Sequence, residues 1–372
     1  MKINTVEALS LEAPLEKFVA RARQTVPLKA RRCLLVKITT DEGLVGYGEG
    51  LTPVAPQVAA AVVEQVLAPF LIGRDPVNTE PLWEMLYATQ SSRGYTRGYQ
   101  MIAISAVDIA LWDLKGKILG QPVYRLLGGG FRDKIPVYAT GLMMEGSPEA
   151  MVDLARSYYE RGFRAMKLKI GEETTRDFAR LQALRKAFGP ELKLMVDANG
   201  AYDPPTAVRI GKKLEELDIY WFEEPVPPED LAGMAWIKQH ISMYLAAGEC
   251  EYTKYAFREL LLKKAIDICQ PDIARAGGIT ECKKIAALAQ AFNKHYAPHA
   301  WGGVLCVTAT LHLAKSLPNF LICEFDQVPN PLRDELPARP LNFKDGFLQV
   351  SDGPGLGVEL NEEVIEKYTV RN

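Results

Sequence analysis

The sequence lacks several features that would place it in a specialised class of protein. Its six cysteines have no CxxC spacing, so neither a zinc site nor a small disulfide framework is predicted, and most should be buried free thiols. No run of eighteen apolar residues occurs, and the N-terminus reaches Glu7 before any apolar run develops. We therefore expect no membrane-spanning segment and a cytoplasmic location.

An excess of charge of one sign is also missing. The 44 Lys and Arg residues nearly balance 46 Asp and Glu residues, for a formal net charge of −2. This balance gives no global reason to bind nucleic acid or an anionic membrane, so a charged ligand must be held locally. Hydrophobic residues (48%) and charged residues (24%) occur at globular levels, which argues against a disordered or fibrous chain.

The N-terminal part of the chain has the pattern of an α+β domain. Residues 33–40 and 44–50 alternate as two strands around an Asp-Glu-Gly turn, and residues 59–71 and 102–119 have helical spacing. Strands followed by helices in this way predict a separate domain over residues 1–130.

From residue 131 the pattern changes to short apolar strands that alternate with helices. The intervening segments are long enough for right-handed crossovers, which predicts a parallel (β/α)8 barrel of the TIM type over residues 131–339. Residues 340–372 are expected to contain irregular chain and a short strand, and to fold back on the N-terminal block. The eight expected strands are residues 137–140, 165–170, 192–197, 220–223, 244–248, 266–270, 296–299 and 321–324.

Single charged residues stand at the ends of these apolar runs. From Asp197 onward they follow one another at intervals of 23 to 27 residues, which is one strand-helix unit. Because the C-terminal ends of all barrel strands face one mouth, these side chains should converge there. The residues are Lys167, Lys169, Asp197, Glu223, Glu249, Asp272, His299 and Glu324.

Three of these residues predict a magnesium site. Asp197, Glu223 and Glu249 end consecutive strands and offer the hard oxygen ligands that Mg2+ prefers. Each acid alone would be read as a helix N-cap or a surface residue, but three in register favour a metal. Asn199 either contacts the metal shell or a substrate hydroxyl, or is a turn residue before Gly200.

The remaining residues predict acid and base groups. Lys167 and Lys169 lie two apart on one strand, so both face the barrel interior, and each ammonium should lower the pKa of the other. We expect Lys167 to hold a substrate carboxylate and Lys169 to abstract a proton. Asp272 and His299, almost opposite the lysines, predict a dyad in which the carboxylate fixes the imidazole tautomer.

Two further acids have weaker predictions. Glu324 ends the eighth strand and can donate or accept a hydrogen bond to a developing enediolate, although an ion pair at the barrel rim is the alternative. Glu224 is expected to orient its neighbours rather than bind metal, because adjacent strand residues point oppositely.

Substrate specificity is expected to reside in two loops of the N-terminal block, near residues 15–32 and 52–57. The first of these loops is basic. Its side chains could meet a distal carboxylate or hydroxyls of the substrate, but we favour a solvated basic loop. Its basic residues are Arg21, Arg23, Lys29, Arg31 and Arg32.

As a set, these motifs resemble the mandelate racemase subgroup of the enolase superfamily. The resemblance implies an α+β capping domain over a modified TIM barrel, with Mg2+ held by the three acids. It also implies that Lys169 and the Asp272/His299 dyad flank the substrate, and that Glu324 meets its carboxylate. The tail is similar to galactarolactone cycloisomerases and to aldonate or aldarate dehydratases. The motifs are Lys167-Leu168-Lys169, Val196-Asp197-Ala198-Asn199, Phe222-Glu223-Glu224-Pro225, Gly248-Glu249, Gln270-Pro271-Asp272, Pro298-His299, Glu324 and residues 105–113.

The chemistry shared by such sites is removal of a proton α to a carboxylate, with electrostatic stabilisation of the enolate dianion. We expect loss of a β-oxygen from an acid sugar or its lactone, by dehydration or cycloisomerisation. One alternative is racemisation or epimerisation of a 2-hydroxy acid, and another is a catalytically silent barrel that acts as a binding protein. The expected partner is a small carboxylate substrate, and we also expect a homo-oligomer.

Overall fold

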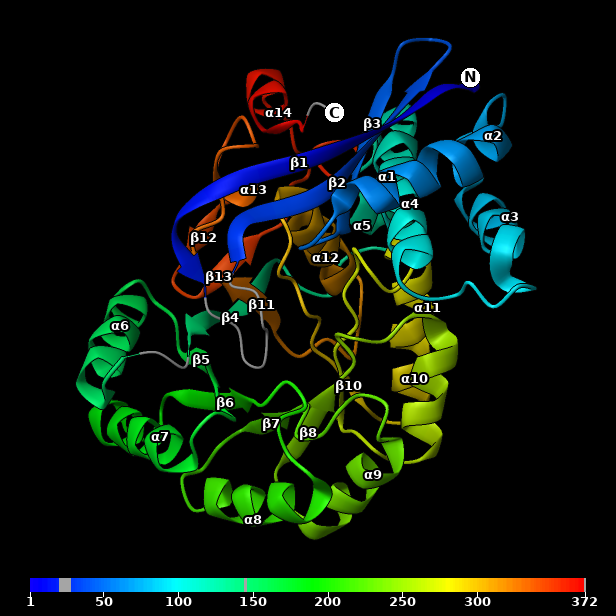
Figure 1. The fold of residues 1–372 in the computed structure, drawn as a ribbon. Coiled ribbons are helices and arrows are strands. Elements are labelled where there is room, and N and C mark those ends of the chain that lie inside the picture. The colour runs from blue at the N-terminus through cyan, green and yellow to red at the C-terminus, as the bar shows by residue number, and fades with distance from the viewer. Residues whose placement is uncertain (20–27, 144–145, 371–372) are drawn as a thin grey trace.

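The structure is a computed structural model that describes residues 1–372 except 20–27, 144–145 and 371–372 (Figure 1). Its N-terminal part is built on a three-stranded antiparallel sheet in the order β1-β2-β3. The strands are β1 (Ile3–Val19), β2 (Leu28–Thr40) and β3 (Val45–Leu51). The predicted hairpin corresponds to β2 and β3, whereas β1 was not predicted.

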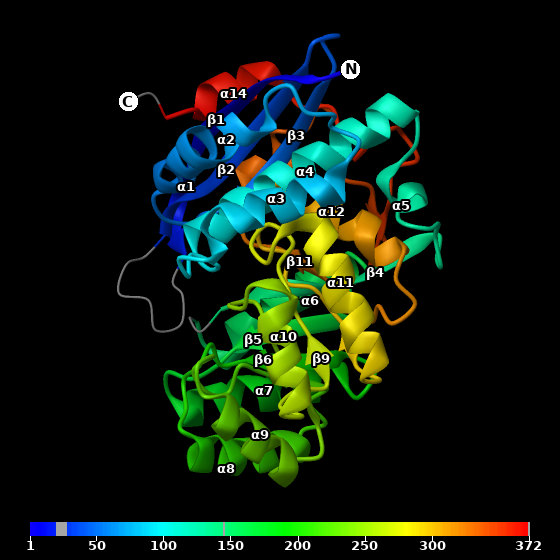
Figure 2. The same ribbon diagram turned by 90° about the vertical axis from the view of Figure 1, so that its right-hand side faces the viewer.

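Helix α4 (Tyr99–Leu119) packs closely against this sheet. A Cβ atom at Gly48 would lie 2.0 Å from the carbonyl oxygen of Ala106 in α4, so glycine at this position of β3 allows the close approach. Figure 2 shows α4 with α3 alongside it. The other helical segments of this part are α1 (Pro56–Val62), the π-helix η1 (Val63–Leu67), α2 (Ala68–Leu71), α3 (Thr79–Ser91) and α5 (Val123–Leu126).

Eight parallel strands then form the barrel, as predicted. Each pairs with the next from β4 to β10, β11 pairs with β4, and a bridge between Tyr296 and Phe320 completes the ring. The strands are β4 (Lys134–Leu142), β5 (Ala165–Lys169), β6 (Lys193–Asp197), β7 (Trp221–Glu223), β8 (Tyr244–Ala247), β9 (Ile268–Cys269), β10 (His295–Tyr296) and β11 (Cys323–Asp326).

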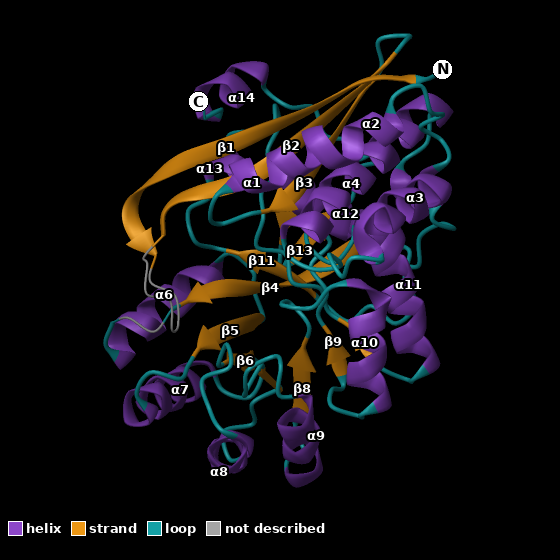
Figure 3. Cartoon of the chain, turned by 45° about the vertical axis from the view of Figure 1, so that its right-hand side comes forward, coloured by secondary structure: helices purple, strands orange, loops and turns teal. Residues whose placement is uncertain are grey.

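Helices surround these strands on the outside (Figure 3). Inside the barrel, a cluster that includes Tyr138, Met195, Trp221 and Ile268 is fully buried and fills the space below the strand ends. The polar mouth therefore stands on a packed floor. The helices are α6 (Pro148–Glu160), α7 (Thr174–Phe188), α8 (Pro204–Glu215), α9 (Leu231–His240), α10 (Thr253–Leu262), α11 (Gly278–Ala291), α12 (Val304–Lys315) and α13 (Pro331–Asp334).

The tail contacts both parts of the molecule. The hairpin of β12 (Phe343–Lys344) and β13 (Phe347–Gln349) adds to the barrel, because β13 pairs antiparallel with β4. Later residues contact the N-terminal part: Gly355 bridges to Pro122, and Thr369, after α14 (Glu362–Tyr368), bridges to Leu11 of β1. The expectation that the whole tail folds back on the N-terminal block is therefore wrong for the hairpin. The domain limits at residues 130 and 339 stay predictions.

Within the described ranges, none of the helices has the length and apolar character needed to cross a bilayer.

Candidate active site

A cavity of about 320 Å3 opens at the C-terminal ends of the barrel strands. Five of the predicted site residues line it, and the other four lie beneath its surface with 0% exposure. Leu51 and Pro53 from the N-terminal part contribute to its wall. The lining residues from the prediction are Lys169, Asn199, Glu249, His299 and Glu324, and the four buried ones are Lys167, Asp197, Glu223 and Asp272.

The three predicted metal ligands lie together. Asp197, Glu223 and Glu249 each place a carboxylate oxygen within 4.8 Å of the others. Burial, followed by the nearby charge of Asp197, raises the pKa of Glu223 to about 8. Three carboxylates gathered in one place repel one another unless cations offset their charge, and the two lysines described below do so only in part. One oxygen of Glu249 (Oε2) is buried without a hydrogen-bond partner. The residues therefore fit Mg2+, which takes oxygen ligands.

Glu223 is held in place by the floor of the barrel. Its Oε2 atom accepts hydrogen bonds from Trp221 Nε1 (3.1 Å) and Gln270 Nε2 (2.8 Å), which leaves Oε1 to face Lys167 at 2.6 Å. This arrangement orients one oxygen toward the ligand group before any ion arrives.

The two lysines sit among these carboxylates. Lys167 Nζ lies 3.7 Å from Asp197 and 3.6 Å from Glu324, in addition to its pair with Glu223. Lys169 is paired with Asp197 and donates to Asn199 Oδ1 at 2.8 Å. Asn199 also donates to Glu249 Oε1 at 3.2 Å. It therefore contacts the predicted metal-ligand group, as expected if Asn199 belongs to the metal shell.

The expected lowering of the lysine pKa values is wrong for this arrangement. Burial lowers the pKa of both side chains, and Lys167 adds a lowering effect on Lys169. The carboxylates outweigh both effects: Glu223 and Glu324 raise the pKa of Lys167 well above its usual value, and Asp197 raises that of Lys169. Sequence reasoning counted the neighbouring ammonium groups and left out the acids that the fold brings between them.

The predicted dyad forms. His299 Nδ1 lies 2.5 Å from Asp272 Oδ2, and Asp272 Oδ1 accepts from Ala274 N at 2.8 Å. Burial lowers the pKa of His299, but the carboxylates of Glu249, Glu324 and Asp272 outweigh it and raise that pKa to about 9. The imidazole is therefore charged at neutral pH, with Nε2 3.5 Å from Glu249 and 3.8 Å from Glu324.

Glu324 is a fixed, ionised carboxylate. Thr140 Oγ1 donates to its Oε1 at 2.6 Å, and Ala300 N donates to its Oε2 at 2.9 Å. Burial alone would raise its pKa, but Lys167 and His299 hold the pKa well below the usual range. Lys167 at 3.6 Å and His299 at 3.8 Å make Glu324 part of an ion-pair cluster, as the alternative interpretation expects, and its hydrogen bond with an enediolate stays a prediction.

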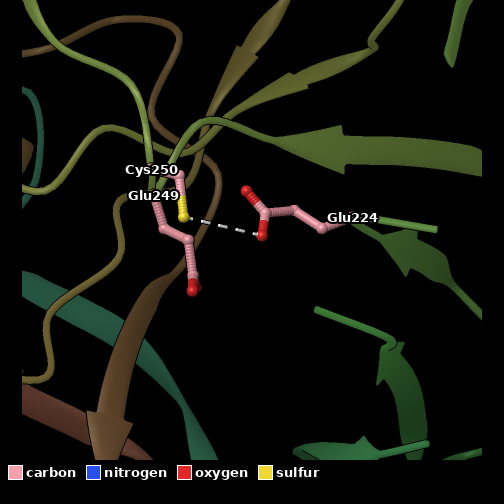
Figure 4. Close-up of side chains that lie close together, drawn as sticks. All are labelled: Glu224, Glu249 and Cys250. Atoms are coloured by element: carbon pink, nitrogen blue, oxygen red, sulfur yellow. Dashed lines mark hydrogen bonds between the residues drawn. The ribbon is translucent and has the colours of Figure 1, made fainter. Parts of the chain in front are cut away.

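Glu224 lies at the cavity wall, contrary to the alternation expected from its neighbour. The strand ends at Glu223, and Glu224 has a φ of 37°, which turns its side chain toward the same mouth. Figure 4 shows its carboxylate opposite Glu249 and Cys250. A glutamate at this position does not by itself predict a backbone turn with positive φ.

Several residues near the cavity were not predicted. Arg275 lines it and donates to the carbonyl oxygen of Glu249 at 2.7 Å. Glu49 of β3 is buried and accepts from Gly303 N, and from Cys306 N at 3.0 Å, in the first turn of α12. Trp301 forms part of the cavity wall.

The expected solvated basic loop is wrong for Arg31. This side chain is 4% exposed, pairs with Asp326 at 2.5 Å and lies over the Trp301 ring at 4.0 Å. Arg32 pairs with Glu12 at 2.7 Å. Arg21 and Arg23 lie outside the described residues.

Comparisons with known proteins agree with this arrangement. Residues 150–364 match the family model described as enolase C-terminal domain-like. Residues 6–128 match the N-terminal domain of mandelate racemase and muconate lactonizing enzyme. The chain therefore belongs to the enolase superfamily, in its mandelate racemase subgroup, as the motifs predicted.

Individual relatives carry names from acid-sugar chemistry. The chain is 37% identical to D-galactarolactone cycloisomerase of Agrobacterium fabrum, with 99% of each chain covered, and 35% identical to arabinonate dehydratase of Saccharolobus solfataricus, with 90% of each covered. It superposes on 3,6-anhydro-D-galactonate cycloisomerase from Zobellia galactanivorans with a TM-score of 0.91 and 39% identity, with 100% of each chain covered.

A racemase from Streptomyces coelicolor with bound magnesium gives the same TM-score, 0.91, at 31% identity, with 99% of this chain and 100% of that chain covered. The protein is an enzyme of the acid-sugar dehydratase or cycloisomerase type. These comparisons give no support to a catalytically silent barrel.

Proposed function

We propose that the enzyme removes the proton α to the carboxylate of an acid sugar or its lactone and expels a β-oxygen, with Mg2+ bound by Asp197, Glu223 and Glu249. The observation that carries the proposal is the pair of groups that line one cavity from distant strands. Lys169 extends from the end of β5, and His299, hydrogen-bonded to Asp272, follows β10.

Each group has one proton to move. Lys169 accepts the α-proton at Nζ, and the electron pair of the broken C–H bond enters the carboxylate as an enediolate. The enediolate then re-forms the carboxylate as the β-carbon–oxygen bond breaks, and His299 Nε2 protonates the departing oxygen. The resulting enol becomes a ketone when a proton adds at the β-carbon, which becomes a methylene.

Mg2+ held by Asp197, Glu223 and Glu249 would supply positive charge that stabilises the negative charge developing on the substrate. Lys169 is an ammonium while it is paired with Asp197, so its amine is free to accept a proton only when Asp197 has another partner. Lys167, buried below the cavity, and Glu324, which lines it 3.6 Å away, are proposed to meet the substrate carboxylate.

Dehydratases at 35% identity support dehydration, but two cycloisomerases with higher identity support cycloisomerisation. The chain resembles two cycloisomerases over its full length, at 37% and 39% identity. A cycloisomerase conserves the atoms of its substrate, and β-elimination does so when the leaving oxygen belongs to a ring of that substrate. We therefore propose a cyclic acid sugar as the substrate. A homo-oligomeric state and a cytoplasmic location stay predictions.

Product structure tests this proposal. The Mg2+-loaded enzyme is incubated in D2O with D-galactarolactone, 3,6-anhydro-D-galactonate, D-galactonate or arabinonate, and followed by NMR and mass spectrometry. We expect a cyclic substrate to give an opened product with a deuterated methylene and no loss of water. An open-chain substrate that loses water would make the enzyme a dehydratase. An epimer that keeps every hydroxyl would overturn the elimination.

A further inference from the structure

A second group of potential ligand atoms lies on the wall of the cavity. Glu224, Glu249 and Cys250 each offer one atom, and these atoms are within 4.8 Å of one another (Figure 4). The Cys250 thiol lies 3.9 Å from Glu224 Oε2. Only Glu249 also belongs to the group proposed for Mg2+.

Two carboxylate oxygens of this group lack a hydrogen-bond donor among the described residues. Glu224 is 2% exposed, and its Oε1 atom accepts no hydrogen bond from the described residues. The Oε2 atom of Glu249 is likewise buried and accepts no hydrogen bond from the described residues, and it lies 3.5 Å from His299 Nε2. Buried carboxylates that lack partners are costly and take up a proton or a cation.

The sulfur atom decides which cation fits. Thiolates select soft ions such as Zn2+ over Mg2+. With Zn–S and Zn–O bonds of about 2.3 and 2.0 Å at a tetrahedral angle, the sulfur and oxygen lie about 3.5 Å apart. The observed 3.9 Å between Cys250 and Glu224 is within a small side-chain adjustment of that spacing.

We propose that Glu224, Glu249 and Cys250 bind a soft divalent cation of the Zn2+ class. Two carboxylates and one thiolate leave a tetrahedral ion one open position, which water from the cavity fills. The thiol proton is released to solvent as the sulfur–metal bond forms.

Such an ion inhibits the enzyme. The ion competes with Mg2+ for the carboxylate of Glu249, and it occupies the wall of the substrate cavity. This inhibition rests on the function proposed above, but the binding itself does not. A soft-metal site therefore adds a regulatory contact to the catalytic mouth.

Cd2+ is a suitable probe because its bond to a thiolate produces a charge-transfer absorption in the near ultraviolet. The Mg2+-loaded protein is titrated with Cd2+ at neutral pH. We expect a band that saturates at one equivalent, is absent in Cys250→Ala, and requires at least about tenfold more Cd2+ in Glu224→Gln. Cys269→Ala, which removes a buried thiol of β9, is the matched control and should keep the band.

Mg2+ calorimetry on Cys250→Ala confirms that the variant is folded, and Glu224→Gln tests the site separately if it is not. A band that persists in Cys250→Ala, or Cd2+ affinity that is unchanged in Glu224→Gln, overturns the site. In a second assay, Zn2+ is added to the Mg2+-saturated enzyme and α-proton exchange is measured. We expect inhibition of the wild type, and at least tenfold weaker inhibition of Cys250→Ala relative to its own uninhibited rate.

The two assays separate the two proposals. A Cd2+ band without turnover of any acid sugar would leave the cation site intact and defeat the proposed function. Turnover without a thiolate band would support the proposed function and overturn the cation site. Glu224 would then carry a proton instead of binding a cation.

Discussion

The two sides of the cavity hold their charged groups in different ways. Lys169 is paired with Asp197 and Asn199, and Asp197 belongs to the proposed metal group. His299 is paired with Asp272, which lies outside that group and is itself fixed by Ala274 N. Lys169 is therefore paired directly with a member of the metal group. His299 is influenced by that group through Glu249, but its direct hydrogen-bond partner, Asp272, stays in place whether or not metal is bound.

The largest expected effect is the loss of either proton-transfer group, Lys169 or His299. Lys169→Ala and His299→Asn should each lower turnover by about 10²- to 10⁴-fold, the usual contribution of a positioned acid or base. Only Lys169→Ala should also abolish exchange of the substrate α-proton in D2O, measured by NMR. Near-normal turnover in both variants would show that the two-group arrangement is wrong.

Removal of the dyad carboxylate should have the next largest effect. In Asp272→Asn the imidazolium loses a negative neighbour, so the pKa of His299 falls from about 9. Turnover that needs the protonated imidazole is lost as the pH rises through this pKa, so the basic limb of the pH–rate profile should move to lower pH. We expect a loss of about tenfold at neutral pH and more at higher pH. An unmoved basic limb would assign that limb to another group.

The metal side can be tested without substrate. Glu223→Gln and Glu249→Gln each remove one anionic ligand and should weaken Mg2+ binding at least about tenfold by calorimetry. Glu64→Gln, at an exposed position of η1, is the matched control. Unchanged affinity in both ligand variants would defeat the assignment.

A small effect is expected from Thr140→Val. The hydroxyl that donates to Glu324 at 2.6 Å is lost, and the pKa of Glu324 should rise modestly. We expect a loss of about threefold to tenfold in kcat/KM, in line with one hydrogen bond. A loss as large as that of His299→Asn would give Thr140 a direct part in the reaction.

Much of the fold and most of the site were predictable because barrel strands read as short apolar runs that end in a charged residue. Parallel pairing then brings Asp197, Glu223 and Glu249 together with no further information. Strand β1 was harder to predict because it contains Pro14, a residue that argues against a strand. Proline is tolerated there because β1 lies at the edge of its sheet.

The parts that were missed depend on contacts between distant residues. Glu224 enters the cavity through a backbone turn of φ 37°, which its own identity does not indicate. Arg31 is buried against Asp326 and Trp301, which are distant from it in the sequence. The pKa values of Lys167 and Lys169 are set by acids on neighbouring strands.

The buried carboxylate of Glu49 limits whether the N-terminal part can be replaced by that of a relative. It extends from β3 to the first backbone amides of α12, the helix that follows the His299 loop, and Gly302 and Gly303 leave the space it occupies. The backbone N–H groups at the start of α12 thus find their acceptor in the N-terminal part rather than in the barrel. A chimera that receives the N-terminal part of a relative in order to change its substrate must bring an acid at this position of β3, or the loop that carries the imidazole loses its anchor.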